Sequence, residues 1–392
     1  MSIEREGDMQ TIRIGGPKRQ AVNMLLALAS RGGDLPGHRA IRSGLLCGVL
    51  AFSATAFMPE MSLADEGGVS FWLPGLFGSL AAVPQQPGWS QTSIYYHTTV
   101  SAGSDVAAAR EFQIGRIPAN LTANLNASLN ATGDVGLVIP TYVFASPVLG
   151  GQASASVLAS YGTSSASLAG TLTGSLTGPG GTTIPFGPRF DNISNTAWGF
   201  GDVMPQFSLR WNAGVNNYMT YVTGDIPVGV YSSSSLANLG IGHGTIDAGG
   251  GYTYFNPMTG HEFSAVLGAT YNFINQSTQY QNGVDLHLDW GASQFLTKQV
   301  QAGLVGYVYK EVGCDSGSGD RVGCFQSQVV GIGPQLGYIF PVGGMQGYLN
   351  LKAYEEFDAS DRPKGWNAWV TFVLSPAAAT PPTTPKKRMI TK

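Results

Sequence analysis

The sequence predicts an all-β protein: a closed antiparallel transmembrane β-barrel of about 12–14 strands. Only 11% of the residues are charged, against about 25% in typical soluble domains. The mean hydropathy of the chain is nevertheless close to neutral. Soluble proteins need surface charge and helical membrane proteins need long apolar runs, whereas membrane barrels alternate apolar and polar residues along each strand. That alternation is the third observation.

The alternation is clearest between Asn217 and Ser375. Successive side chains of a strand point to opposite faces, so that one face meets lipid and the other meets the lumen. In 284–292 one face carries Val284, Leu286, Leu288, Trp290 and Ala292, and the other carries Asp285, His287, Asp289 and Gly291. We expect strands near 90–100, 113–124, 134–145, 152–161, 166–174, 203–211, 218–227, 244–255, 261–273, 281–291, 299–310, 326–340, 345–356 and 365–374. The first five rest on weaker patterns, and a barrel of 12 strands is the alternative.

The lengths of the expected connections predict an orientation. From residue 256 onward, short connections (256–260, 292–298 and 341–344) alternate with longer ones (274–280, 311–325 and 357–364). Outer-membrane barrels have short periplasmic turns and longer outer loops. Both ends of the barrel are therefore expected in the periplasm, and segments 175–202 and 228–243 are expected to be outer loops.

The N-terminus has the layout of an export signal. A basic stretch at 38–42 precedes an apolar stretch at 44–57, and Ser62-Leu63-Ala64 offers small residues for cleavage after Ala64. We expect residues 1–64 to be removed and the mature chain to reach the outer membrane of a Gram-negative bacterium. A buried core helix at 44–57 and a lipoprotein signal at Cys47 are the alternatives.

The mature chain is expected to have three parts: an apolar N-terminal segment (65–89), the barrel (90–375) and a disordered Pro-rich tail (376–392). Bulky apolar residues ahead of a first strand would be an aggregation liability if they were exposed in the periplasm. We therefore predict that the first part plugs the lumen through Phe71, Trp72, Leu73, Leu76 and Phe77. A strand or short helix at the periplasmic mouth is the alternative.

Three polar residues and two prolines inside expected strands are further candidates. Asp285, His287 and Asp289 are predicted to face the lumen as a pore lining. A metal site is the alternative there, although one ion would need ligands from neighbouring strands because residues two apart on a strand are about 7 Å apart. Pro205 and Pro334 should each force a bulge or a break in strand pairing, which either opens a lateral exit or is a harmless irregularity.

Cys314 and Cys324 are predicted to form a disulfide. Export places them in an oxidising compartment, and the residues between them are polar and rich in turn formers. A metal site of two cysteines with no nearby histidine is the less favoured alternative. The parity of the connections puts this loop on the outer side of the membrane.

Several functions are disfavoured by composition. From Asp65 onward acidic residues outnumber basic ones, which argues against nucleic acid as a partner. No nucleophile motif surrounds His97, His243, His261 or His287, so no enzymatic activity is expected. No cofactor is implied. Outer-membrane lipid and the barrel-assembly machinery are the partners that such a barrel requires.

Four segments resemble the SphA-like family, also labelled the phenol-degradation meta-pathway family of outer-membrane β-barrel proteins. They are DEGGVSFWLPGLFGSLAAVPQQPGW (65–89), GDVMPQFSLRW (201–211), YTYFNPMTGHEFSAVLGATYNFINQSTQYQNG (252–283) and GPQLGYIF (333–340). The resemblance implies a channel for passive uptake of hydrophobic small molecules, including aromatic ones. A structural or adhesive outer-membrane protein and a general porin are the alternatives, and region 119–190 matches the family poorly.

Overall fold

The computed structural model describes residues 70–103, 120–177, 183–320, 324 and 326–377. The expected signal sequence 1–64, residues 65–69 and most of the expected tail lie outside the described residues. No helix in the described parts of the chain is long and apolar enough to span a membrane. The strands are β1 (Gly88–Ala102), β2 (Asn120–Val143), β3 (Gln152–Thr177), β4 (Thr183–Ala213), β5 (Asn216–Asp225), β6 (Thr245–Phe255), β7 (His261–Asn272), β8 (Asp285–Phe295), β9 (Val300–Glu311), β10 (Gln328–Val342), β11 (Met345–Ser360) and β12 (Lys364–Pro376).

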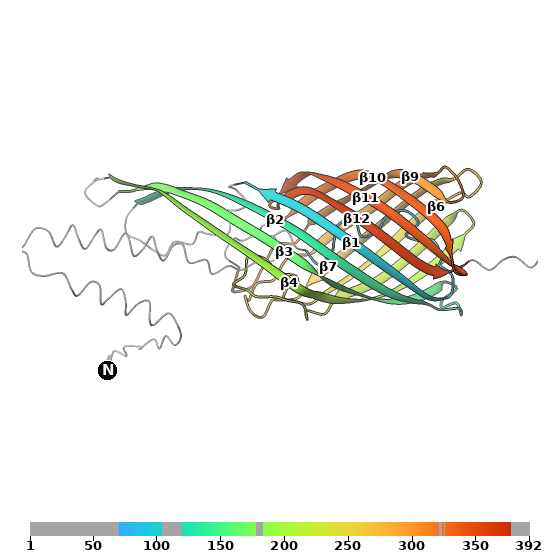
Figure 1. The fold of residues 1–392 in the computed structure, drawn as a ribbon. Coiled ribbons are helices and arrows are strands. Elements are labelled where there is room, and N and C mark those ends of the chain that lie inside the picture. The colour runs from blue at the N-terminus through green and yellow to red at the C-terminus, as the bar shows by residue number, and fades with distance from the viewer. Residues whose placement is uncertain (1–69, 104–119, 178–182, 321–323, 325, 378–392) are drawn as a thin grey trace, which may run out of the picture. The chain divides into compact units, whose positions relative to one another are not determined.

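These twelve strands form one closed antiparallel barrel, which confirms the predicted fold class (Figure 1). Each strand pairs with its neighbours in sequence, and β1 pairs with β12 from Gln91↔Leu374 to Ser101↔Lys364 to close the wall. Closure leaves no free sheet edge in the wall itself, as a lipid environment requires.

The strand count falls from the expected fourteen to twelve because four expected short strands merge into two long ones. Segments 113–124 and 134–145 were expected to be separate, but β2 runs unbroken from residue 120 to 143; likewise, β3 joins 152–161 and 166–174. The misleading signals were glycines. Gly133 and Gly162 lie within the β2–β3 ladder, and a Cβ on Gly162 would clash with the Asp134 carbonyl oxygen. They permit close approach of two strands and do not mark turns.

The expected outer loop 175–202 is also wrong, because β3 and β4 continue through most of it. β1 pairs with β2 only from Leu129 onward, and β4 pairs with β5 over 206–213 with a single bridge at Val203↔Ile226. The remaining parts of β2, β3 and β4, which pair only with one another, therefore form a three-stranded sheet that extends past the barrel wall, as Figure 1 shows. The low-complexity composition of this region hid its strand pattern.

The two faces of the wall have opposite character. Along β7, Phe263, Leu267 and Tyr271 are exposed on the outside, whereas Ser264 and Thr270 are buried in the lumen. The same alternation holds along β8, where Asp285, His287 and Asp289 are buried. An apolar belt outside and a polar lumen are the arrangement of a membrane barrel.

The connections differ between the two ends of the barrel. The end that carries the start of β1 and the close of β12 has connections such as 214–215 and 343–344, and we call it the inner end. The opposite, outer end carries longer connections such as 226–244 and 312–327. The loop-length rule of outer-membrane barrels assigns the inner end to the periplasm.

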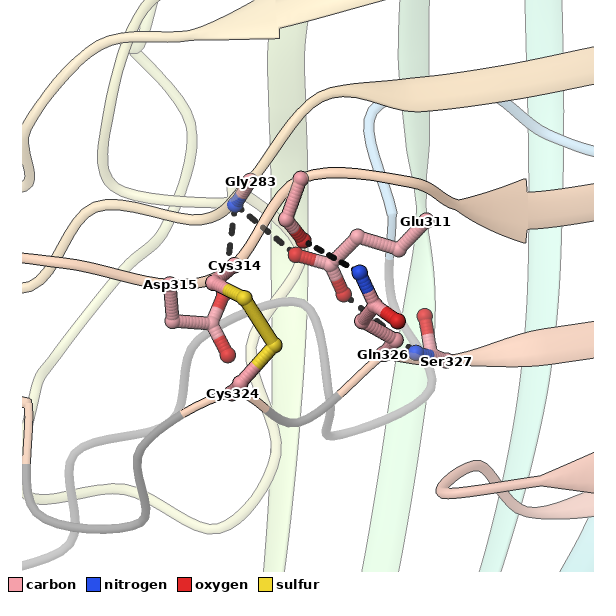
Figure 2. The surroundings of a disulfide bond; sticks show 8 residues. Gly283, Glu311, Cys314, Asp315, Cys324, Gln326 and Ser327 are labelled. Atoms are coloured by element: carbon pink, nitrogen blue, oxygen red, sulfur yellow. Dashed lines mark hydrogen bonds between the residues drawn. A yellow bond between two sulfur atoms is a disulfide. The ribbon is translucent and has the colours of Figure 1, made fainter.

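The predicted disulfide between Cys314 and Cys324 is confirmed, and it lies in the β9–β10 connection at the outer end. Figure 2 shows how this connection is joined to the one between β7 and β8. The Gly283 N–H donates to Glu311 Oε1 at 2.8 Å and to Asp315 Oδ1 at 3.1 Å. Ser327 N donates to the other Glu311 oxygen at 3.3 Å. The disulfide thus tightens a loop that is anchored to its neighbour by carboxylates.

Candidate functional site

The lumen contains the residues that precede β1. We call residues 70–87 the N-terminal segment. Its Phe71, Trp72 and Ala82 are buried and its Leu73, Leu76 and Phe77 are half-buried. Phe71 and Trp72 pack in one apolar cluster with Met219, Tyr221, Ile241 and Val266. Leu73 and Leu76 pack against a second cluster that includes Leu137, Leu158 and Trp369.

Trp72 sits at the centre of an aromatic stack in the lumen. Its ring lies on the imidazole of His287, with 3.7 Å between centroids and 14° between planes. Phe77 and Tyr221 complete the group, each within about 6 Å of the Trp72 ring. The five apolar residues predicted as a lumen plug are thus found in contact with side chains of the barrel interior.

The backbone of the N-terminal segment is held by charged side chains of the wall. Asp289 on β8 accepts hydrogen bonds from Gly75 N at 2.9 Å and from Phe77 N at 3.1 Å. Lys352 on β11 donates to the Gly75 carbonyl oxygen at 2.6 Å. The segment satisfies only some of its backbone groups internally, as in Leu76 N to Leu73 O, and lumen side chains bind others in place of a ladder.

Further along the segment, other strands supply the partners. Leu80 N donates to Glu262 Oε1 at 2.9 Å, and Ala82 N donates to Thr253 Oγ1 at 3.0 Å. Arg210 Nε donates to the Ala81 carbonyl oxygen at 3.3 Å. Gly75 turns the chain at φ +92°, where an added Cβ would lie 3.0 Å from the Tyr354 ring. The segment is therefore fixed by β4, β6, β7, β8 and β11 together.

The predicted pore-lining residues Asp285, His287 and Asp289 all face the lumen, but each is engaged by protein groups. His287 Nε2 lies 2.8 Å from Asp247 Oδ2, which also accepts from Thr270 Oγ1 at 2.6 Å. Asp285 accepts from Asn272 Nδ2 at 2.9 Å. No group of three or more His, Cys, Asp or Glu among the described residues is arranged to hold a metal ion.

Two cavities lie on either side of the N-terminal segment. The outer cavity, of about 150 Å³, is lined by residues of outer connections such as Leu239 and Arg362. The inner cavity, of about 250 Å³, reaches Gln85 and Arg210. Five of the lining residues are common to the two cavities: Phe71, Trp72, Leu73, Leu158 and Met204. The apolar side chains of the segment thus separate two spaces along one wall of the barrel, and Asp285, His287 and Asp289 line neither.

At Pro205 and at Pro334, where an irregularity was predicted, the hydrogen-bonded ladder has a gap but its register does not shift. The β4–β5 ladder stops at Gln206↔Thr223 and has only the Val203↔Ile226 bridge beyond it. Pro205 lies in this gap, and Thr223 Oγ1 donates to its carbonyl oxygen at 2.9 Å. The β10–β11 ladder passes from Ile332↔Glu355 to Gln335↔Lys352, and Pro334 lies between them. The missing N–H of proline accounts for each gap.

Sequence reasoning missed Lys352, Arg210 and Glu262, which hold the segment. Their signal was a charged residue at a lumen-facing position of a strand. Such a residue requires a partner inside the barrel, but the sequence does not say which.

The family model described as "Putative MetA-pathway of phenol degradation" matches residues 115–372, more than half of the chain. Among solved structures, the chain is similar to an outer-membrane channel from Pseudomonas putida F1, with a TM-score of 0.54 and 13% identity over 74% of this chain and 96% of that one. A FadL homologue from Pseudomonas aeruginosa matches with a TM-score of 0.32 and 9% identity, over 82% of this chain and 95% of that one. No curated protein sequence matches the chain. The chain is an outer-membrane β-barrel.

Proposed function

We propose that this protein is an outer-membrane channel for passive uptake of hydrophobic small molecules, including aromatic ones. The chain belongs to the family described as the putative MetA pathway of phenol degradation. The observation that carries this proposal is the apolar N-terminal segment lying between two cavities of one lumen. In this reading Phe71, Trp72 and Leu73 plug a conduit. A solved structure with a similar fold is an outer-membrane channel. The proposal includes no enzymatic activity.

The lining of the cavities supports an apolar cargo. Leu137 and Tyr96 join the segment around the outer cavity, and Ile94 and Ile139 join it around the inner one. Pockets for small molecules are lined mostly by apolar and aromatic side chains with a few polar groups. A general hydrophilic porin would instead present an open, polar channel, so this alternative is disfavoured.

The gap at Pro205 supports a sideways exit from the inner cavity. Met204, Gln206 and Thr223, which flank this gap on β4 and β5, all line the inner cavity. A hydrophobic molecule there is separated from lipid only by a stretch of wall with an interrupted ladder. Neither Pro334 nor its neighbour Gly333 lines either cavity, so Pro334 is the weaker candidate.

Uptake by intact cells tests the proposal. We would measure entry of radiolabelled naphthalene into Gram-negative cells that carry or lack the gene, because their lipopolysaccharide leaflet is the barrier that such a channel bypasses. We expect faster uptake with the gene, and a further rise for Trp72→Ala, which removes the ring between the cavities. Equal uptake with and without the gene would refute the proposal. Thr297→Ala, in the short β8–β9 connection at the inner end, is the control.

A surface-adhesive function is the second candidate, and the sheet extension of β2, β3 and β4 favours it. This sheet projects beyond the outer end of the barrel and is rich in Asn, Ser and Thr. Shortening it by removing residues 121–127 and 170–187, so that β2 and β3 end together, should leave naphthalene uptake unchanged if it serves adhesion. Loss of cell–cell or surface attachment would support this role, and unchanged attachment would argue against it.

A further inference from the structure

Three buried basic side chains lie along the two cavities without a carboxylate bound to them. Arg362 lines the outer cavity, and Arg210 and Lys352 line the inner one. The ion pairs found among the described residues both involve histidines, and none includes these three residues. No Asp or Glu in the described parts of the chain lines the inner cavity. Each cavity thus combines apolar side chains with buried basic ones, and the outer cavity also carries the carboxylates of Asp202 and Glu356.

Arg362 is the most unusual of the three. It lies in the turn between β11 and β12, is only 8% exposed, and its buried Nη1 has no hydrogen-bond partner among the described residues. The guanidinium rests on the ring of Tyr309, with Cζ 4.6 Å from the centroid. The guanidinium is therefore a cation that is buried without an ion-pair partner among the described residues. A cation–π contact offsets only part of the cost of burying it.

Three carboxylates that share the outer cavity with Arg362 or lie within its electrostatic reach are hydrogen-bonded to other groups. Glu356, which lines the same cavity, accepts from Tyr307 Oη and from Gly365 N, both at 2.8 Å. Asp202 accepts from the backbone N–H groups of Gly229 and Ile241, each at 2.7 Å. Asp285, within electrostatic reach of Arg362, is bound by Asn272. These charges moderate the local potential, but none of them accepts a hydrogen bond from the buried Nη1 of Arg362.

The rest of the outer cavity has the size and character to hold one aromatic ring. Phe71, Leu137, Leu158 and Met204 form its apolar wall. Its volume of about 150 Å³ equals that of an apolar protein cavity of about 150 Å³ that binds benzene. A ring in this space would have the guanidinium of Arg362 on its rim.

The inner cavity repeats this combination on the far side of the N-terminal segment. Arg210 Nη1 donates to the hydroxyl oxygens of Ser154 and Ser208, at 3.2 and 2.7 Å. Lys352 Nζ donates to the Gly75 carbonyl oxygen and lies 5.0 Å from the Trp369 ring centroid. All of these hydrogen-bond partners are neutral; Asp289 is a nearby counter-charge for Lys352, whereas Arg210 binds only neutral groups.

We propose that the conduit recognises small apolar carboxylates, specifically one-ring aromatic acids in their anionic form. The ring would lie against Phe71 and Leu158, and the carboxylate would pair with the Arg362 guanidinium, which is suited to bidentate binding of that group. Arg210 and Lys352 receive the anion after passage. This inference rests on the proposed channel function and names its substrate class.

Calorimetric titration of the detergent-solubilised mature protein with benzoate and with benzamide, its neutral analogue of the same shape, tests the inference. We expect benzoate to bind at least tenfold more tightly than benzamide. Arg362→Gln should remove that preference and leave benzamide binding within twofold. Arg362→Lys keeps the charge and should retain most of the preference, which guards against a variant that fails to fold. Lys364→Gln removes an exposed charge two residues away and should change neither affinity.

Equal binding of benzoate and benzamide, or no binding of benzoate, would overturn the inference. So would a benzoate preference that survives Arg362→Gln. Cell uptake separates this failure from failure of the channel itself. If naphthalene uptake depends on the gene but benzoate has no advantage over benzamide, the channel stands and the carboxylate site falls. If naphthalene enters no faster with the gene than without it, the proposed function fails.

Discussion

Asp289→Asn should release the N-terminal segment from the lumen. The carboxylate binds two backbone N–H groups, Gly75 N at 2.9 Å and Phe77 N at 3.1 Å. A hydrogen bond to a charged group contributes about 1.5–3 kcal/mol. The amide keeps one acceptor oxygen but loses the charge and at least one of the two bonds, and Lys352 loses a nearby counter-charge. We therefore expect docking of the segment to weaken by about 3 kcal/mol.

Because every 1.4 kcal/mol is a factor of ten in population, the undocked fraction should rise by about 100-fold. Cysteine labelling measures this fraction directly. Ala82 is fully buried, and the two cysteines of the barrel are held in a disulfide. An Ala82→Cys background should therefore react with a water-soluble maleimide only when the segment leaves the lumen, and the labelling rate reports the undocked population.

Glu356→Gln is the matched control for Asp289→Asn. Glu356 is also a buried lumen carboxylate that accepts two hydrogen bonds, but its partners are Tyr307 and Gly365, outside the N-terminal segment. The labelling rate of this variant should stay within twofold of the parent. A similar rate for Asp289→Asn would refute the idea that this carboxylate holds the segment, as would an equally large rise in the control.

Three further predictions follow from the same geometry. Gly75→Ala should weaken docking of the N-terminal segment by about 1–2 kcal/mol because of the left-handed backbone, with a further cost from contact with Tyr354, and should raise the labelling rate at least tenfold. Gly214→Ala is the control, because Gly214 also has a positive φ (+71°) but open space around it. This variant should lower the melting temperature without changing the labelling rate. Replacing both Cys314 and Cys324 by Ser should lower the unfolding free energy by about 3 kcal/mol, the loop-closure value for this spacing, and should speed proteolysis of the β9–β10 connection; unchanged stability and proteolysis would contradict a clamping role. Burial lowers the pKa of His243, so its neutral form is favoured in the fold, and the stability that it contributes should be full above the unfolded pKa of about 6.5 and fall as the pH drops below it. The protection factors of connection 226–244, which correct the exchange rates for the intrinsic pH dependence of amide exchange, should accordingly be lower at pH 5 than at pH 7.5, and His243→Gln should remove that difference.

The second half of the barrel could be predicted from the sequence because one face of each strand meets lipid. Along β7 and β8 every second residue is apolar, so the pattern itself determines the register, and the structure buries Asp285, His287 and Asp289 on the face opposite to the apolar one. The region of β2 to β4 lacks this contrast, because much of it extends beyond the barrel wall where no lipid selects an apolar face. Gly133 and Gly162 then resemble turn residues, although they lie in the middle of a ladder.

The burial of the N-terminal segment could be predicted from the sequence, but its partners in the lumen could not. The sequence indicates that Phe71 and Trp72 need burial and that Asp289 needs partners, but these residues lie more than 200 positions apart, and no local pattern joins them. Their meeting depends on closure of the barrel, which brings β8 and β11 to opposite sides of Gly75. Asp289 and Lys352 then bind the N–H and the carbonyl of one glycine. If this segment plugs the lumen as we propose, its docking depends on this pair of opposite charges as well as on apolar packing, so a change at either charge should favour its release. This dependence is why single polar substitutions should open the lumen while the barrel wall stays intact.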